Sequence, residues 1–449
     1  MLRDAHLTSD DFDKLTNFLD EQYFFATKKI FREGKETTAG LYLVREGEVK
    51  ISTKDGSRSE VVGQGGYFGQ EVLLADAHGS IGADCVFTPE YTATAGEGQR
   101  CVLGFLPLAE CRNIFDTKTL GHEVFNGPCP EIMEARDEMR KLVKANVSLD
   151  DLERESILGE GLFGEVWLVR ADVHKTGDPE KRQIFALKIQ TTNTSVRADA
   201  TEAIKREMSV LSQLKHPFVV DLVNKYQDDD NIYMLMNVIR GGELWSVIHK
   251  EGDDGEWVSG MSEQQAKFYA LVIADTLSSI HRQNVVYRDL KPENVLIDEE
   301  GYPILVDFGF AKHCPDKTHT FCGTPNYLAP EIVMNRGHTF GCDHWALGIV
   351  IYEMLAGENP FFFDGMDQMS LFEAIVREEM YPLSDETSQE AFDIVDGLLQ
   401  KDPKDRLGML AGREKDLLTH KWFDGLDLTA MRSKKLPAPW IPSEDELAG

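Results

Sequence analysis

The sequence predicts an α+β protein in which a small β-rich N-terminal domain precedes a larger domain of strands and helices. Short strand-like segments punctuated by glycines occupy residues 28–69 and 91–107, which indicates a compact β-structure. From residue 151 onward, strand pairs give way to longer helical stretches. The length of 449 residues also exceeds what one hydrophobic core usually organises, so we expect two or three domains.

Composition excludes several classes of protein. The content of 42% hydrophobic and 28% charged residues is typical of a globular chain, and the net charge of -30 argues against nucleic-acid binding. That charge favours basic partners. Seven cysteines without a CxxC pair fit a reducing compartment. No apolar signal segment is apparent at the N-terminus, and WALGIVIYEMLAG is too short to span a bilayer. We therefore expect a cytoplasmic protein that binds neither nucleic acid nor membrane.

The elements follow in order along the chain. Residues 8–20 predict a capped helix, and residues 108–115 a helix that closes the first domain. Between them we expect the strands of a small β-roll, carried by KKIFREG, GLYLVREGEVKIS, RSEVVGQGGYFG and YTATAGEGQRCVLGFLP. The domains expected are 1–118 (β-roll), 119–150 (a solvated helical linker with mixed charges), 151–423 (the large domain) and 424–449 (a short C-terminal tail).

The start of the large domain carries a pattern suited to a triphosphate. LGEGLFGEV places Gly159, Gly161 and Gly164 in a strand pair, where small residues let backbone N–H groups approach phosphate oxygens. A glycine-rich turn alone is weak evidence. FALKI then places Lys188 on a strand, and IKREMSVLSQL predicts a helix with Glu207 beside its apolar face. Glu207 is therefore a candidate partner for Lys188.

A second pattern, YRDLKPENVLI, is more specific. Asp289 is a candidate to orient and deprotonate an attacking hydroxyl, and Lys291 to balance charge on a moving phosphoryl group. Asn294 and, in VDFGFAK, Asp307 are candidate metal ligands, the latter on a tight turn. These pieces occur in the order that phosphoryl transfer by a protein kinase requires.

Residues 151–423 resemble a eukaryotic protein kinase domain of the AGC group, and among its members the cyclic-nucleotide-dependent kinases. YRDLKPEN, DFGFAK and TFCGTPNYLAPEI carry the resemblance. It implies a bilobal protein kinase fold, Ser/Thr kinase activity, and ATP and Mg²⁺ as cofactors. It also implies catalytic roles for Asp289, Lys291, Lys188 and Glu207, and magnesium ligation by Asn294 and Asp307. The nucleotide-binding residues it implies are Gly159, Gly161, Gly164, Val166, Ala186, Lys188, Met236, Val238, Glu243 and Leu296.

The same resemblance implies a regulatory and a substrate-binding set. Thr320 matches the activation-loop phosphothreonine, whose phosphate Arg288 and Lys312 would bind. The helix position commonly basic in close relatives is Ala203, so we expect weaker coupling between that phosphate and the helix. Basic protein substrates would meet an acidic subsite, matched here by Glu243, Glu293 and Glu353. Asn326 replaces a further acid of that subsite.

Residues 8–118 resemble a cyclic-nucleotide-binding domain, but both ligand anchors differ. Gln70 stands where a carboxylate would hold the ribose, and Tyr91 where an arginine would hold the cyclic phosphate. The insertion Ala75–Glu90 separates them and contains neither Lys nor Arg. Losing the arginine pair weakens binding by about 2–4 kcal/mol, or roughly 30- to 1000-fold. We expect weak or absent cyclic-nucleotide binding, with another small ligand or none in its place.

Two alternatives remain open at this point. One is a kinase that cyclic GMP or cyclic AMP does activate through residues 1–118. The other is a pseudokinase scaffold that binds a partner without catalysing transfer. The feature that separates an active kinase from the second alternative is an intact catalytic set. Its members are all present, namely Lys188, Glu207, Asp289, Asn294 and Asp307.

Overall fold

The computed structural model divides into two compact units, Met1–Gly127 and Pro128–Gly449, each described here by itself. The residues that the structure describes are 20–24, 27–54, 59–62, 67–69, 86–89, 91–96, 101–108, 130–161, 164–191, 198–251, 257–314, 317–410, 412–443 and 447. The predicted helix at 8–20 falls outside them except for Asp20, which begins a strand. Gln70, most of the insertion and most of the closing helix also lie outside the described residues.

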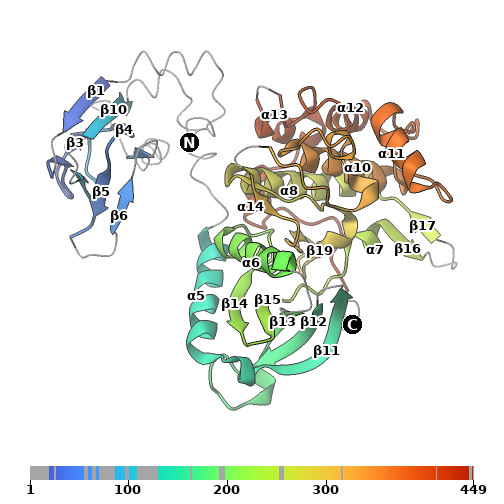
Figure 1. Cartoon of the computed structure of the whole chain (residues 1–449), viewed down its shortest axis with the longest axis horizontal. Helices are drawn as coiled ribbons and strands as arrows, with labels where there is room; N and C mark the ends of the chain where they lie inside the picture. The colour runs from blue at the N-terminus through green and yellow to red at the C-terminus, as the bar shows by residue number, and fades with distance from the viewer. Residues whose placement is uncertain are drawn as a thin grey trace. The chain divides into compact units, whose positions relative to one another are not determined.

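The first unit is the β-roll that the sequence predicts, and Figure 1 shows its strands. Two four-stranded sheets have the orders β1-β10-β4-β7 and β2-β9-β5-β6, and β3 pairs with β8. Successive side chains of a strand point to opposite faces of the sheet, so apolar residues at every second position cover its inner face. Val49 and Ile51 are buried, whereas Lys50 between them is exposed. The strands are β1 (Asp20–Phe24), β2 (Lys29–Phe31), β3 (Thr37–Thr38), β4 (Gly40–Glu46), β5 (Val49–Ser52), β6 (Ser59–Val62), β7 (Tyr67–Phe68), β8 (Val86–Phe87), β9 (Thr92–Ala95) and β10 (Cys101–Pro107).

The second unit begins with a small lobe built on one antiparallel sheet of order β11-β12-β13-β15-β14. The apolar stripe of one helix, α6, includes Ile204 and Leu211, both buried, and the half-buried Met208, as the sequence periodicity predicts. The elements of this lobe are β11 (Glu153–Gly161), β12 (Gly164–Ala171), β13 (Gln183–Thr191), α6 (Ala198–Gln213), β14 (Leu222–Gln227) and β15 (Asn231–Asn237).

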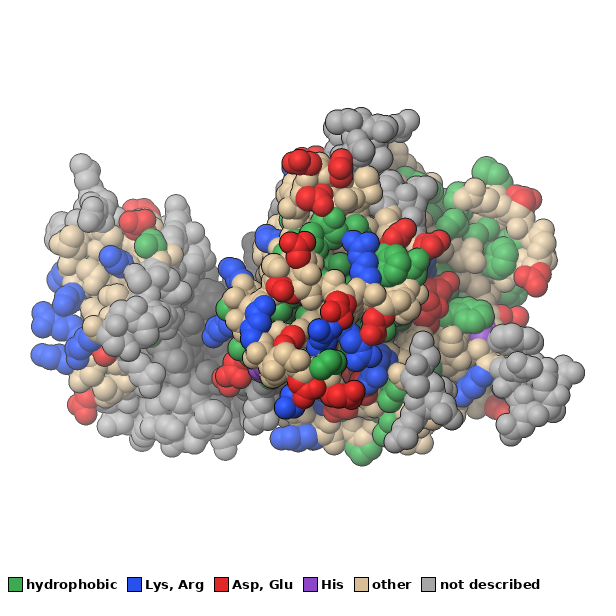
Figure 2. Space-filling view, turned by 90° about the horizontal axis from the view of Figure 1, so that it is seen from below, with side chains coloured by type: hydrophobic (Ala, Val, Ile, Leu, Met, Phe, Trp, Pro, Cys, Tyr) green, Lys and Arg blue, Asp and Glu red, His purple; other side chains and the backbone are tan. Residues whose placement is uncertain are grey.

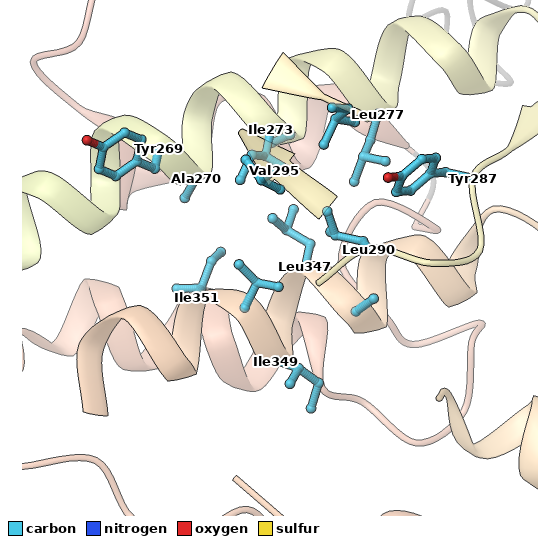
Figure 3. Packing of buried hydrophobic residues seen from close by; sticks show 14 of the residues in the cluster. Tyr269, Ala270, Ile273, Leu277, Tyr287, Leu290, Val295, Leu347, Ile349 and Ile351 are labelled. Carbon is cyan, nitrogen blue, oxygen red and sulfur yellow. The ribbon is translucent and has the colours of Figure 1, made fainter. Parts of the chain in front are cut away.

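The large lobe is mainly helical and is centred on two buried helices, α8 and α10. Figure 3 shows side chains from the two helices on either side of a buried layer that includes Leu290 and Val295. Ser262 and Gln265 form a capping box that fixes the start of α8. The main elements are α7 (Leu244–Ile248), β16 (His249–Glu251), β17 (Trp257–Ser259), α8 (Glu263–Arg282), β18 (Val285–Val286), β19 (Val295–Ile297), β20 (Pro303–Leu305), β21 (Lys312–His313), α9 (Pro330–Val333), α10 (Gly341–Ala356), α11 (Gln368–Arg377), α12 (Gln389–Leu398), α13 (Glu414–Leu418) and α14 (Leu428–Arg432).

Helix α5 (Pro130–Asn146) corrects the expectation of a solvated linker. It belongs to the second unit and packs along β14. Its Arg136 donates to the backbone carbonyls of His216, Pro217 and Val219 at 2.8, 2.7 and 3.0 Å. Val143 is fully buried against the same lobe. Mixed charge on this helix therefore reflects specific contacts rather than exposure on all sides.

The tail after residue 423 lies against the large lobe and reaches the segment that joins the lobes. Arg432 in α14 donates to the buried carboxylate of Asp275 at 2.6 Å. Further along, Pro442 lies beside Gly241, where a Cβ would meet its ring at 2.5 Å. Among the described residues, no helix is both long and apolar enough to cross a membrane.

Candidate active site

A cleft of about 1060 Å³ opens between the two lobes of the second unit. The residues that line it include every described nucleotide-binding candidate except Gly161, namely Gly159, Gly164, Val166, Ala186, Lys188, Met236, Val238, Glu243 and Leu296. Asp307, Arg288, Glu293 and Thr320 line it as well. The cleft therefore gathers residues that lie far apart in the sequence.

Strand register explains how the small lobe presents its candidates to this cleft. Val166 pairs with Lys188 across β12 and β13, and Ala186 pairs with Met236 across β13 and β15. Gly161 pairs with Gly164 at the tip of the hairpin. A Cβ on Gly164 would lie 1.8 Å from the Ile189 carbonyl oxygen, so only glycine fits there. The hairpin can thus lie close over a bound phosphate chain.

Lys188 is held by two carboxylates. Its Nζ lies 2.6 Å from Glu207 Oε1 and 3.3 Å from Asp307 Oδ1. Burial acts to lower the pKa of Lys188, but Glu207 and Asp307 outweigh burial, so the pKa is raised. Lys188 is therefore a fixed positive charge in the cleft.

Asp289 is fixed through both of its carboxylate oxygens. The amide of Asn294 donates to Oδ2 at 2.7 Å, while the backbone N–H and hydroxyl of Thr324 donate to Oδ1 at 3.1 and 3.0 Å. Lys291 Nζ lies 4.0 Å from Oδ2. This arrangement orients one carboxylate beside one ammonium, as proton acceptance and phosphoryl charge balance require.

Asp343, in α10, holds the backbone of the same loop. Its oxygens accept from the backbone N–H groups of Tyr287 and Arg288 at 2.9 and 2.7 Å. His281 Nε2 lies 2.7 Å from Oδ2. Asp343 is fully buried, so these contacts replace the water it has lost. The backbone around Asp289 is thereby anchored to α10.

Of the two candidate metal ligands, Asp307 lines the cleft, whereas Asn294 is buried and is not among the lining residues. The backbone N–H of Val306 donates to the Asn294 carbonyl at 3.0 Å, so the two chain segments lie side by side. Asp307 is the residue that follows Val306. Asp307 has φ +50° and accepts from Gly309 N–H through Oδ1 at 3.1 Å. Lys188 lowers the pKa of Asp307 against the opposing effect of burial, so its carboxylate is ionised. A carboxylate and an amide oxygen suit Mg²⁺, which prefers oxygen ligands and few protein donors.

The three acidic substrate candidates do not share one environment. Glu243 is exposed at the cleft, and burial followed by the charge of Glu293 raises its pKa. Glu293 has a buried Oε2 that accepts no hydrogen bond from the described residues. Glu353 is 7% exposed and lies outside the cleft lining. It accepts from Tyr327 Oη at 2.7 Å and lies 3.4 Å from His249 Nε2.

Thr320 is exposed and lines the cleft, whereas its neighbour Thr318 is buried. Of the two expected phosphate ligands, Lys312 donates to the Thr318 hydroxyl at 3.2 Å. Arg288 is 7% exposed and donates from Nε to the Phe310 carbonyl at 2.8 Å. A buried ion pair lies in the same lobe, with Arg406 Nη1 2.8 Å from Glu331 Oε1.

Of the two anchor positions in the first unit, the structure describes Tyr91, whereas Gln70 lies outside the described residues. Tyr91 is 2% exposed, and its ring lies 5.3 Å from that of Phe31. Its hydroxyl accepts from the backbone N–H of Gly69 at 3.1 Å. A Cβ on Gly69, which has φ +89°, would lie 2.7 Å from the Gly40 carbonyl oxygen. Tyr91 therefore reaches the turn at which the sequence placed a nucleotide anchor.

Sequence reasoning missed several residues that act on the candidates. Thr324 holds Asp289, and Tyr327 with His249 contacts Glu353. Arg206 on α6 is a further residue that lines the cleft. Thr324 stands inside the quoted motif TFCGTPNYLAPEI, which is a signal that could have identified it. Nothing in the local sequence pattern points to the pairing of His249 with Glu353, which lies in α10.

Comparison with known families agrees with this geometry. A model described as "Protein kinase domain" matches residues 152–423. A model described as "Cyclic nucleotide-binding domain" matches residues 21–118. The two matches correspond to the second and first units of the structure.

Individual relatives match almost the whole chain. A cGMP-dependent protein kinase egl-4 of Caenorhabditis briggsae is 32% identical over 449 residues, which cover 98% of this chain and 57% of that protein. A human cGMP-dependent protein kinase 2 is 29% identical over 459 residues, covering 97% of this chain and 58% of the relative. The chain thus spans less than two thirds of the length of either relative.

Proposed function

Because the chain belongs to the protein kinase family and is similar to cGMP-dependent protein kinases, we propose that it transfers the γ-phosphoryl group of ATP to protein Ser or Thr hydroxyls. The observation that carries this is the single cleft with Lys188, Asp307 and the nucleotide-binding candidates on its walls. The Asp289 loop, braced by Asp343, lies directly before the metal-ligand candidate Asn294 in the chain. These contacts support a complete catalytic set rather than a scaffold.

Each residue has a task in this mechanism. Val166, Ala186 and Leu296 offer apolar walls to the base of ATP, and Lys188 offers its charge to the phosphates. Asn294 and Asp307 would hold Mg²⁺, which neutralises developing charge on the phosphates when bound. Asp289, oriented by Thr324 and Asn294, accepts the proton of the substrate hydroxyl. Lys291, whose Nζ lies 4.0 Å from Asp289 Oδ2, stabilises negative charge on the phosphoryl group that is transferred.

Loss of the Lys188 ammonium or of the Asp307 carboxylate tests this proposal. Lys188→Met and Asp307→Asn should each remove nearly all magnesium-dependent transfer from ATP to a Ser/Thr peptide. Thermal unfolding of each variant checks that the fold survives. Wild-type rates in both folded variants would show that the kinase assignment is wrong.

Acidic residues at the cleft favour basic substrates. The unbonded, buried Glu293 Oε2 and the exposed Glu243 carboxylate offer acceptors to an arginine guanidinium. Glu353 is already engaged by Tyr327 and His249, so its role is to shape the subsite. A peptide library should therefore select arginine at the third position before the target residue, with weaker selection at the second. A proline-directed or acidic preference would contradict this.

For the first unit, we infer that micromolar cyclic GMP or cyclic AMP does not control the kinase. The Gly69 N–H is engaged by the Tyr91 hydroxyl, and Tyr91 offers no positive charge to a cyclic phosphate. Calorimetric titration should detect no submicromolar binding by the wild type. The double variant Tyr91→Arg with Gln70→Glu supplies both missing anchors and should bind more tightly. Submicromolar binding by the wild type would favour the alternative, a kinase activated by cyclic nucleotide.

A further inference from the structure

A histidine on the strand pair β16–β17 reaches the acidic subsite from outside the catalytic loop. Strand β16 follows α7 directly and pairs with β17, so that His249 stands opposite Ser259. The base of the pair is anchored, because the backbone N–H of Met261 donates to the Met354 carbonyl of α10 at 2.7 Å. Figure 1 shows both strands at the edge of the large lobe, beside α7. The fold therefore holds His249 against α10 through a fixed backbone.

The imidazole of His249 contacts the carboxylate of Glu353 through one of its two ring nitrogens. Nε2 lies 3.4 Å from Glu353 Oε1, and Nδ1 lies 3.1 Å from the Ser259 hydroxyl. The ring also packs against that of Trp245 in α7, with centroids 4.9 Å apart. Tyr327 Oη donates to the other Glu353 oxygen at 2.7 Å. Both carboxylate oxygens of Glu353 are therefore engaged within the chain itself.

The charge on His249 decides how much of the negative charge on Glu353 is left for a substrate. Burial raises the pKa of Glu353, the hydrogen bonds from Tyr327 and His249 lower it, and the charge of Glu293 raises it. A neutral imidazole donates to the carboxylate and leaves it with a full charge and spare acceptor sites for an arginine. A protonated imidazole keeps the same hydrogen bond and also balances that charge. Histidine is the side chain that changes between these two forms near neutral pH.

We propose that His249 is a specificity-determining residue: its protonated form weakens the selection of arginine at the second position before the target residue, and its neutral form permits that selection. This rests on the proposed function, in which Glu353 belongs to the subsite for basic substrates. An arginine guanidinium shares the carboxylate with a neutral His249, whereas a protonated His249 competes with it as a second cation in the same place. Substrate choice therefore depends on pH through a residue outside the cleft lining.

The test measures peptide binding to the full chain, so that it does not depend on phosphoryl transfer. Labelled peptides carry alanine in place of the target residue, arginine at the third position before it, and either arginine or the neutral citrulline at the second. Fluorescence anisotropy gives the ratio of the two Kd values at pH 6 and at pH 8, and the ratio removes pH effects that both peptides share. The variants are His249→Gln, which is neutral at both pH values, and His249→Arg, which is charged at both. The control Lys250→Ala removes an exposed charge from the next residue.

In the wild type, the preference for arginine over citrulline should be about 3- to 10-fold larger at pH 8 than at pH 6, as the gain or loss of one charge-assisted pair implies. His249→Gln should keep the larger preference and His249→Arg the smaller one at both pH values, and Lys250→Ala should follow the wild type. A wild-type preference that is the same at both pH values, or a pH dependence that survives in His249→Gln, would overturn the proposal. Absence of transfer by a wild type that shows the expected binding would instead count against the proposed function.

Discussion

Single residues decide whether the catalytic loop is ordered, and Asp343 shows this most clearly. Its carboxylate accepts from two successive backbone N–H groups and from His281. An asparagine side chain at this position has one oxygen and one NH₂ group. In either orientation the NH₂ group faces N–H donors that now bind a carboxylate oxygen, and it cannot accept a hydrogen bond from them. The loop that carries Asp289 would then lose at least one of its anchors.

We therefore predict that Asp343→Asn lowers kcat by about 10- to 100-fold, because small displacements of a catalytic group have effects of this size. The Kd for ATP should change little, since Asp343 does not line the cleft. Steady-state kinetics with a Ser/Thr peptide and equilibrium binding of ATP separate the two effects. A kcat within twofold of the wild type would show that Asp343 does not position the loop.

His338 offers a second test at the residue scale, through pH. Burial, assisted by the charge of Arg288, lowers the pKa of His338 from 6.5 to about 4. Asp343 and Glu331 oppose this shift, and His319 adds to it. Between these two pKa values the unfolded chain binds a proton that the folded chain does not. Stability should therefore fall as the pH falls from 6.5 towards 4.

His338→Gln should show a smaller loss of stability across that pH range than the wild type does. Urea unfolding followed by tryptophan fluorescence measures the difference, since all six tryptophans lie after residue 127. Identical pH dependence in the two proteins would contradict the assignment of a depressed pKa to His338.

At this scale, the sequence supports a prediction where chemistry restricts the residue type. Lys188, Asp289 and Asp307 were found because phosphate transfer requires those groups in that order, and the structure brings Lys188 and Asp307 within 3.3 Å. Contacts that many residue types could make were not found. The pairings of Tyr91 with Gly69 and of His249 with Glu353 depend on tertiary distance rather than local pattern.

At the scale of elements, strands and buried helices were predicted better than helices that dock through polar groups. The strands of the first unit followed from alternation and glycines, and α6 followed from its apolar period. Helix α5 has no long apolar stripe, so its charges suggested solvation. Its Arg136 instead binds three backbone carbonyls after α6. A side chain that pairs with distant backbone leaves no periodic signal in the sequence.

Arg136→Met should accordingly destabilise the second unit by about 2–4 kcal/mol, because several charge-assisted bonds are lost together. Lys141→Met, at an exposed position of the same helix, serves as the matched control. Tryptophan fluorescence during urea unfolding reports on the second unit alone. Equal stability in the two variants would show that α5 is only loosely attached.

For the whole molecule, the net charge of -30 connects composition with substrate choice. Figure 2 shows acidic side chains spread over the second unit, among basic and apolar ones. In the cleft, Glu243 and Glu293 concentrate negative charge near the catalytic loop. Under the proposed function, we therefore expect this surface to attract basic substrate segments.

This attraction should weaken with salt. The distance over which exposed charges interact is about 10 Å at 0.1 M ionic strength and becomes shorter as salt is added. The KM for an arginine-containing peptide should therefore rise several-fold as NaCl is increased. A peptide with citrulline in place of arginine keeps the shape without the charge and should show little dependence. Equal salt dependence for both peptides would place the effect outside the acidic subsite.

The measurement that tests the central claim most directly is the initial rate of transfer of labelled γ-phosphate from ATP to a Ser/Thr peptide. Wild type and Asp289→Asn are compared at saturating Mg²⁺, and ATP binding is measured in parallel to show that the cleft is intact. We predict measurable transfer by the wild type and a reduction of about 10²- to 10⁴-fold in Asp289→Asn with ATP affinity retained. Equal rates in both proteins, or no transfer by a wild type that binds ATP, would contradict the account and favour a scaffold.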